Sequence, residues 1–176
     1  AGYPSSQIKG SWPVVDILNQ GDHPMSTSRQ YWLNTSSLSM DHQVQPSGKA
    51  TRESMHRWMK VVPKIQRLKD QGWDARSFDR LLKSPDPVQR ELGETERNLF
   101  RAGPTRITAD YQDGRVTLDN GNHRVLAARE VGTLELPVHV RAKDEQQHLE
   151  MKRKFNAREI SDDRILERTD RDRDSR

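Results

Sequence analysis

The fold is decided by one stretch of the chain, Val116-Thr117-Leu118-Asp119-Asn120-Gly121-Asn122-His123-Arg124-Val125-Leu126-Ala127-Ala128-Arg129-Glu130-Val131-Gly132. Val116 and Leu118 alternate with polar neighbours, which is typical of a half-buried strand. The Asp-Asn-Gly sequence that follows is typical of a tight turn, because these residues tolerate a positive φ. An apolar helical stripe then runs through residues 125–128, and Gly132 is a typical C-terminal stop. The stretch therefore predicts a strand, a turn and a helix in direct succession.

The turn itself predicts an anion-binding site. Free backbone N–H groups at the start of a helix lie at the positive end of its dipole and favour a phosphate. Phosphate contacts are predicted for Asn120, Gly121, Asn122, His123 and Arg124. In a hydrolytic site, Asp119 or His123 would be the base that activates water, and Arg124 would stabilise phosphoryl charge. Asp119 is also the candidate ligand for Mg²⁺, which prefers oxygen atoms.

A purely structural interpretation of this turn stays open. Asp119 and Asn120 can act as capping residues, and Arg124 can pair with a surface carboxylate for a few tenths of a kcal/mol. Glu94 and Arg97 belong to a polar cluster ahead of the preceding strand. They are secondary candidates that could face the phosphate turn, and a solvated helix face is the competing interpretation.

Motifs on both sides of the turn follow a fixed order: Gly103-Pro104, Ile107, Asp113-Gly114, residues 119–124, Ala127-Ala128-Arg129-Glu130, Gly132 and Leu136-Pro137-Val138-His139-Val140. Over residues 101–142 this order resembles the ParB/sulfiredoxin-like fold, in which a Gly-x-x-Arg turn opens an alanine-rich helix. In that family the turn cradles nucleotide phosphates, so the resemblance implies ATP or CTP as a ligand. ParB-like nuclease modules also occur as toxic C-terminal parts of bacterial polymorphic toxins. That use implies DNA or RNA as substrate and an immunity-type inhibitor protein as partner.

Two departures limit what the resemblance implies. ParB partition proteins have Gly-Glu-Arg-Arg at this turn, and sulfiredoxins have Gly-Cys-His-Arg with the cysteine as nucleophile. Here residues 121–124 are Gly-Asn-His-Arg, and the chain contains no cysteine. Thiol-based reduction is therefore excluded. Phosphate binding survives the comparison, whereas the reaction does not carry over.

Composition limits the size of the core and the class of protein. Of 176 residues, 31% are hydrophobic and 32% are charged, so we expect a compact centre with loose ends. A net charge of +4 permits contact with nucleic acid without requiring it. The sequence shows no membrane span and no signal peptide. We expect no membrane partner, and a location in the cytoplasm or in the cytoplasm of a target cell after delivery. The start at Ala1 rather than Met suggests a fragment of a larger protein.

We divide the chain into three parts. Residues 1–49, rich in Ser, Gly, Pro, Gln and Asn, are predicted to form a loosely structured N-terminal arm with apolar clusters at 12–18 and 31–33. Residues 50–157 are predicted to hold the ParB/sulfiredoxin-like domain with its helical preface. Residues 158–176 are predicted to be a charged, disordered tail. The predicted fold class is α+β, a small mixed β-sheet flanked by helices.

Periodicity and punctuation place the elements of the central part. Strands are predicted at 105–111, 115–118 and 134–141, with Gln112-Asp113-Gly114 as a hairpin turn, and a charged helix is predicted from 143 to 157. The helical preface starts near residue 50.

Four residues predict the breaks and starts within that preface. Pro63 is predicted to kink or restart its first helix. Asp74 and Asp86 are predicted N-caps, and Gly93 is predicted to interrupt the last helix before the sheet.

Three hypotheses for function follow. The favoured one is an enzyme of phosphate chemistry, either a nuclease or a nucleotide phosphohydrolase. The second is a non-catalytic nucleotide-binding switch that resembles partition proteins, although no helix-turn-helix segment follows the core. The third is a plain interaction module in which the turn is only structural.

Overall fold

A hairpin and the helix after it form the centre of the fold, which a computed structural model describes over residues 26–41, 44–45, 47–101 and 103–160. β4 (Ile107–Gln112) and β5 (Arg115–Asn120) pair antiparallel. Asp113 and Gly114 take positive φ values in the turn between them, as the sequence of that turn predicts. α4 (Asn122–Val131) begins directly after β5. The predicted succession of strand, turn and helix is confirmed.

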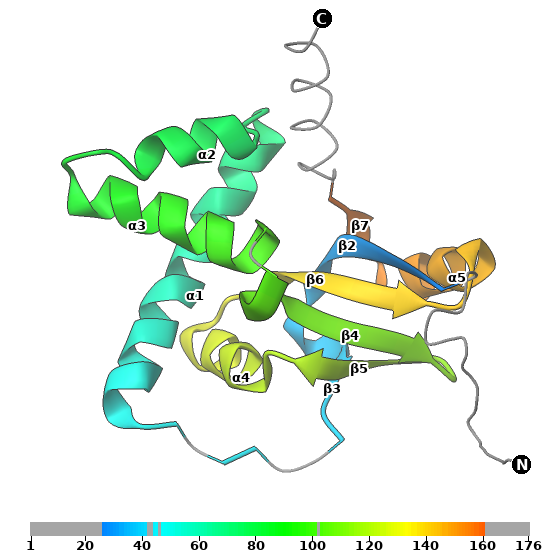
Figure 1. Cartoon of the computed structure of the whole chain (residues 1–176). Coiled ribbons are helices and arrows are strands. Elements are labelled where there is room, and N and C mark those ends of the chain that lie inside the picture. The colour runs from blue at the N-terminus through cyan, green and yellow to red at the C-terminus, as the bar shows by residue number, and fades with distance from the viewer. Residues whose placement is uncertain (1–25, 42–43, 46, 102, 161–176) are drawn as a thin grey trace, which may run out of the picture.

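The hairpin belongs to a mixed sheet of six strands in the order β3-β5-β4-β6-β2-β7 (Figure 1). β6 (Glu135–Ala142) lies parallel to β4 and antiparallel to β2 (Thr27–Asn34). The two edges are short strands, β3 (Leu38–Ser39) and β7 (Arg158–Glu159). Short edges offer little template for pairing with another chain. A mixed sheet with helices around it is the architecture that the sequence predicted.

β2 corrects the predicted N-terminal arm. It pairs with β6 along its whole length, from Thr27 opposite Ala142 to Asn34 opposite Glu135. Tyr31 and Leu33 have no exposed surface. The partner strand lies about a hundred residues further along the chain, so local composition could not reveal the pairing.

The predicted C-terminal tail also differs at its start, because residues 158–159 form β7 beside β2. The apolar cluster at 12–18 and residues 161–176 of the tail lie outside the described residues.

The α-helices described ahead of the hairpin are α1 (Lys49–Asp70), α2 (Ala75–Leu81) and α3 (Pro87–Glu96). A π-helical turn, η2 (Arg97–Arg101), and a 3-10 turn, η3 (Gly103–Thr105), lead from α3 to β4. Figure 1 shows α1, α2 and α3 grouped at one end of the strands and α5 (Glu145–Phe155) at the other. None of the described helices is both long and apolar enough to cross a membrane.

The predicted caps are confirmed, whereas the restart at Pro63 and the interruption at Gly93 are wrong. Asp74 accepts a hydrogen bond from the Ser77 N–H and Asp86 from the Val88 N–H, each at 3.0 Å. α1 runs through Pro63 without restarting, because its buried face packs into the core. α3 likewise runs through Gly93. A Cβ at Gly93 would lie 2.8 Å from the Phe78 carbonyl oxygen, so this glycine lets α2 and α3 approach closely rather than ending a helix.

The core lies between these helices and the sheet. Its largest fully buried apolar side chains are Tyr31, Phe78, Leu33, Met59, Ile65, Leu99, Ile107, Leu136, Met151 and Val62. α4 is tied to the segment between β2 and β3, where the 3-10 turn η1 (Thr35–Ser37) lies. The Arg129 guanidinium donates to the carbonyl oxygens of Thr35 at 2.7 Å and Leu38 at 2.9 Å. This contact fixes the helix that carries the predicted site.

A buried charge cluster joins the helices of the preface. Glu96, with no exposed surface, lies 3.1 Å from the Lys69 ammonium and 2.8 Å from the Arg101 guanidinium. Arg101 also pairs with Asp79 at 2.6 Å. Burial raises the pKa of Glu96, and the two cations oppose that rise. The cluster connects α1, α2, α3 and η2 through side chains that all have partners.

Candidate functional site

The turn between β5 and α4 depends on Gly121. Its φ of 105° and ψ of 19° lie where side chains are strained. A Cβ on this residue would lie 3.1 to 3.3 Å from three atoms of Ile107. Gly121 is the N-cap residue of α4, and no side chain caps the helix. The sharp turn thus presents the first N–H groups of α4 without a side-chain acceptor.

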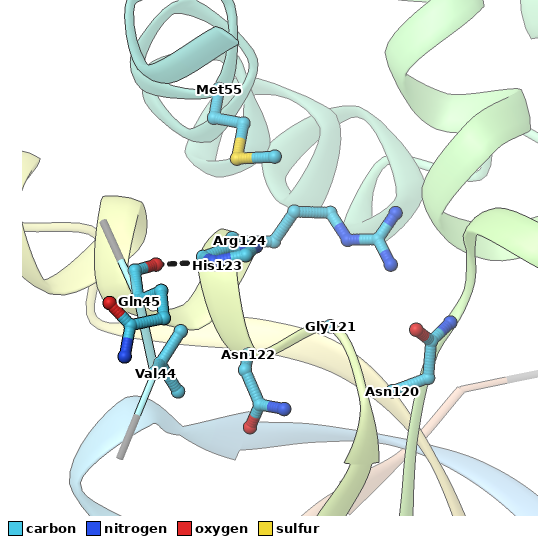
Figure 2. A pocket seen from close by; sticks show the side chains of 8 residues that line it. All are labelled: Val44, Gln45, Met55, Asn120, Gly121, Asn122, His123 and Arg124. Atoms are coloured by element: carbon cyan, nitrogen blue, oxygen red, sulfur yellow. Dashed lines mark hydrogen bonds between the residues drawn. The ribbon is translucent and has the colours of Figure 1, made fainter. Parts of the chain in front are cut away.

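A cavity of about 480 Å³ opens at this turn. One wall is the turn itself, residues 120–124, and the other comes from Val44, Gln45 and Met55. Figure 2 shows Met55 on α1 facing the start of α4 across this space. All five residues predicted to contact a phosphate therefore line one cavity.

Arg124 is a partly buried cation that has no partner among the residues described by the structure. Its Nε is buried and makes no hydrogen bond, and within the described part of the chain no carboxylate pairs with the guanidinium. Burial lowers the pKa of Arg124. In Figure 2 the side chain extends along the cavity towards the side of Asn120. A desolvated cation with no counter-charge costs free energy, and an anion bound beside it would recover that cost.

His123 points the other way. Its Nε2 lies 2.7 Å from the Gln45 carbonyl oxygen, and Figure 2 shows this contact on the side of the turn away from the Arg124 guanidinium. A carbonyl oxygen only accepts, so Nε2 carries the proton and donates. The lone pair of a neutral imidazole then lies on Nδ1. If His123 accepts a proton from water, Nδ1 is the atom that does so.

The two asparagines of the turn differ in their bonding. The Asn120 amide donates to the carbonyl oxygens of Pro104 at 3.2 Å and Arg106 at 3.0 Å. It therefore ties the turn to the chain that enters β4. Asn122, the first residue of α4, is half-buried at the cavity wall. Asn120 therefore has a structural task in addition to lining the cavity.

Three predicted site residues lie outside this cavity. Asp119 is exposed and accepts a hydrogen bond from the Thr108 hydroxyl at 3.4 Å. Glu94 and Arg97 are exposed near the end of α3 and do not line the cavity. In the described residues no three His, Cys, Asp or Glu side chains gather as a metal site. A Mg²⁺ ion at Asp119 would thus take its other ligands from water and substrate, as Mg²⁺ commonly does.

Sequence reasoning missed the second wall and a neighbouring cavity of about 170 Å³. The two cavities share Val44, Met55 and His123. The smaller one is otherwise lined by Ser47, Arg52, Leu126, Ala127 and Glu130. Met55 lies in the helical preface, more than sixty residues before the turn, and no local signal in the sequence linked the two.

We find no protein-family model, curated protein or solved structure that matches the chain.

Proposed function

We propose that the start of α4 binds a phosphate group and that the protein is an enzyme of phosphate chemistry, a nuclease or a nucleotide phosphohydrolase. One observation carries the proposal: the guanidinium of Arg124, which has no partner among the described residues, shares a cavity with the uncapped N-terminus of α4. Both features are positive, and both favour an anion. Arg is also the residue best suited to hold phosphate oxygens in a bidentate contact.

Each residue has a separate task in the proposed reaction. The N–H groups at the start of α4 and the Arg124 guanidinium hold the phosphoryl oxygens and stabilise their charge in the transition state. Nδ1 of His123 takes a proton from water as the water oxygen bonds to phosphorus, and the bond to the leaving oxygen breaks. Mg²⁺, with Asp119 as its protein ligand, would neutralise further charge.

A ParB/sulfiredoxin-like core is part of the same proposal. The mixed sheet and the Gly-x-x-Arg turn at the start of α4 support it. For the biological setting, we propose that the protein is a toxic C-terminal module. It acts in the cytoplasm of a target cell, and an immunity-type protein inhibits it. Asn122 in place of a glutamate or cysteine separates this turn from those of partition proteins and sulfiredoxins.

A nucleotide-binding switch without catalysis is the second candidate. The hydrogen bond from His123 to the Gln45 carbonyl favours this switch. An imidazole that is held by the backbone of Gln45 is suited to fixing that part of the chain beside a bound nucleotide. In that case nucleotide binding would persist without turnover.

Binding and turnover are tested separately. Calorimetric titration with pyrophosphate, ATP and CTP, with and without Mg²⁺, measures binding, and incubation with plasmid, RNA and nucleotides measures turnover. Arg124→Met should abolish binding, whereas Arg153→Met, which removes an exposed arginine of α5, should not. His123→Ala should abolish turnover and keep binding.

Three outcomes decide between the candidates. Binding without turnover in the wild type would select the switch. Absence of binding to every probe would reject the phosphate site. Equal binding by the wild type and Arg124→Met would reject the role assigned to the guanidinium.

A further inference from the structure

We propose that Asn120 is a modification site, at which loss of the side-chain amide nitrogen closes the anion site with a carboxylate of the chain itself. Asn120-Gly121 is the only Asn-Gly pair in the sequence, and every other asparagine is followed by a residue with a side chain. The part of this inference that concerns phosphate binding rests on the proposed function. The modification itself needs no ligand, so the two parts are tested separately.

The reaction uses only the chain and water. The backbone nitrogen of Gly121 attacks Cγ of Asn120, a new C–N bond closes a succinimide ring, and the bond between Cγ and Nδ2 breaks. The proton of the Gly121 N–H leaves with the NH2 group as ammonia. Water then opens the ring to aspartate or isoaspartate, so both products carry a carboxylate at position 120. Glycine favours the first step, because no side chain shields its nitrogen and its backbone is unusually free.

Asn120 lies at a junction that few interactions hold. It is exposed and is the last residue of β5. The register between β4 and β5 shifts between Thr108, which lies opposite Asn120, and Ala109. β3 pairs with β5 at residues 116–117 and does not reach its end, and no side chain caps the helix that follows. Such a segment opens at a fraction of the free energy of global unfolding, so the side chain and the Gly121 nitrogen can meet without loss of the fold.

A carboxylate at position 120 loses the contacts that the amide makes. Nδ2 of Asn120 donates to the carbonyl oxygens of Pro104 at 3.2 Å and Arg106 at 3.0 Å. A carboxylate has no proton to donate, so both carbonyl oxygens repel it. Figure 2 shows the Arg124 guanidinium extending towards the side of Asn120, and this cation has no partner among the described residues. The new carboxylate therefore turns towards Arg124 and takes the place of a bound phosphate.

Incubation of the wild-type protein at mildly alkaline pH, followed by peptide mass spectrometry and an isoaspartate assay, measures the modification. Alkaline pH favours it because the attacking nitrogen must lose its proton. Asn120 should be modified before Asn156, an exposed asparagine that precedes alanine at the end of α5. Equal rates at the two positions would overturn the inference.

Pyrophosphate tests the link between opening and binding. A ligand that binds only the closed turn lowers the opened population, so about ten times its dissociation constant should slow the modification of Asn120 about tenfold. The rate at Asn156 should not change. A rate at Asn120 that bound pyrophosphate leaves unchanged would show that the modification does not compete with the anion site.

Three variants test the closure, with calorimetry for binding and circular dichroism for folding. Asn120→Asp supplies the product directly and should lower the pyrophosphate affinity of fresh protein about tenfold or more. Asn156→Asp makes the same change far along the chain and should keep the wild-type affinity. Asn120→Ser cannot form the ring, so its affinity should stay constant during incubation while that of the wild type falls.

Two outcomes separate this inference from the proposed function. A folded Asn120→Asp protein that binds pyrophosphate as the wild type does would overturn the closure and leave the phosphate site standing. Fresh wild-type protein that does not bind pyrophosphate would reject the proposed function and the closure with it. The order of modification at Asn120 and Asn156 is decided by mass spectrometry in either case.

Discussion

Replacing Gly121 by alanine tests the physical basis of the turn. Two costs add up at this position. A residue with a side chain at φ 105° is strained by about 1 to 2 kcal/mol. The new Cβ would also lie 3.1 to 3.3 Å from Ile107, a side chain without exposed surface, and overpacking of a core costs about 1 to 3 kcal/mol. Gly121→Ala should therefore lower the free energy of unfolding by about 2 to 5 kcal/mol.

Gly132 offers a matched control at the other end of the same helix. Its φ is 80°, but a Cβ there would meet nothing within 4 Å. Gly132→Ala should thus cost only the backbone strain of about 1 to 2 kcal/mol. Both variants gain the same small stabilisation from a less flexible unfolded chain, which cancels in the comparison.

Urea unfolding followed by circular dichroism measures both variants. The difference between them isolates the contact with Ile107. If the two variants lose stability equally, within about 0.5 kcal/mol, Ile107 does not press on the turn. The close fit that we derive for the start of α4 would then be wrong.

Three further predictions concern buried charges and a buried imidazole. Arg124→Met should raise the free energy of unfolding by about 1 kcal/mol while abolishing pyrophosphate binding, because it removes a buried donor, Nε, that has no partner in the described part of the chain. A loss of stability in urea would show that the guanidinium has a partner. Glu96→Gln should lower the free energy of unfolding by about 3 kcal/mol, because Lys69 and Arg101 both lose a buried carboxylate and Arg101 keeps that of Asp79. Glu94→Gln at an exposed position should stay within about 0.5 kcal/mol. Burial lowers the pKa of His148, which hydrogen-bonds Tyr31, so below about pH 6.5 the unfolded chain binds the proton first. Wild-type stability should then fall with pH by up to about 1.4 kcal/mol per unit until the folded-state pKa is reached, and His148→Gln should show a flatter pH dependence in thermal unfolding.

The parts of the fold that could be predicted from the sequence are those determined by interactions between residues close together in the chain. The turn at Asp113-Gly114 requires positive φ values, and the caps at Asp74 and Asp86 use N–H groups two or three residues away. Gly121 likewise marks the boundary between β5 and α4. In each case the determining interaction lies within one turn of chain, so a short pattern contains the information.

The parts that sequence could not predict depend on distant partners. β2 is stabilised by pairing with β6. Gly93 is a point of contact between helices, although its residue type predicts a break. Met55 is a site residue only because α1 passes the start of α4. None of these partners can be identified from the local pattern alone.

Even within the turn, sequence proximity did not predict where the side chains point. Asp119 lies on β5 next to Thr108, outside the cavity. His123 and Arg124 are consecutive on a helix, where each residue is rotated by about 100° from the last. His123 therefore contacts Gln45, and Arg124 extends towards the side of Asn120. Polar residues that are adjacent in the sequence therefore lie in two distinct environments, which one cavity joins.

The contrast between two buried charges supports a functional role for the turn. Glu96 is completely buried, yet it has two cationic partners, and one of them pairs with a further carboxylate. This chain thus satisfies a buried charge where the charge serves the structure. Arg124 has no such partner among the residues that the structure describes. Unsatisfied buried groups are rare in natural proteins, and a functional role is one of the recognised reasons for them. Because the uncapped end of α4 shares the same cavity, both features support the proposal that an anion binds there.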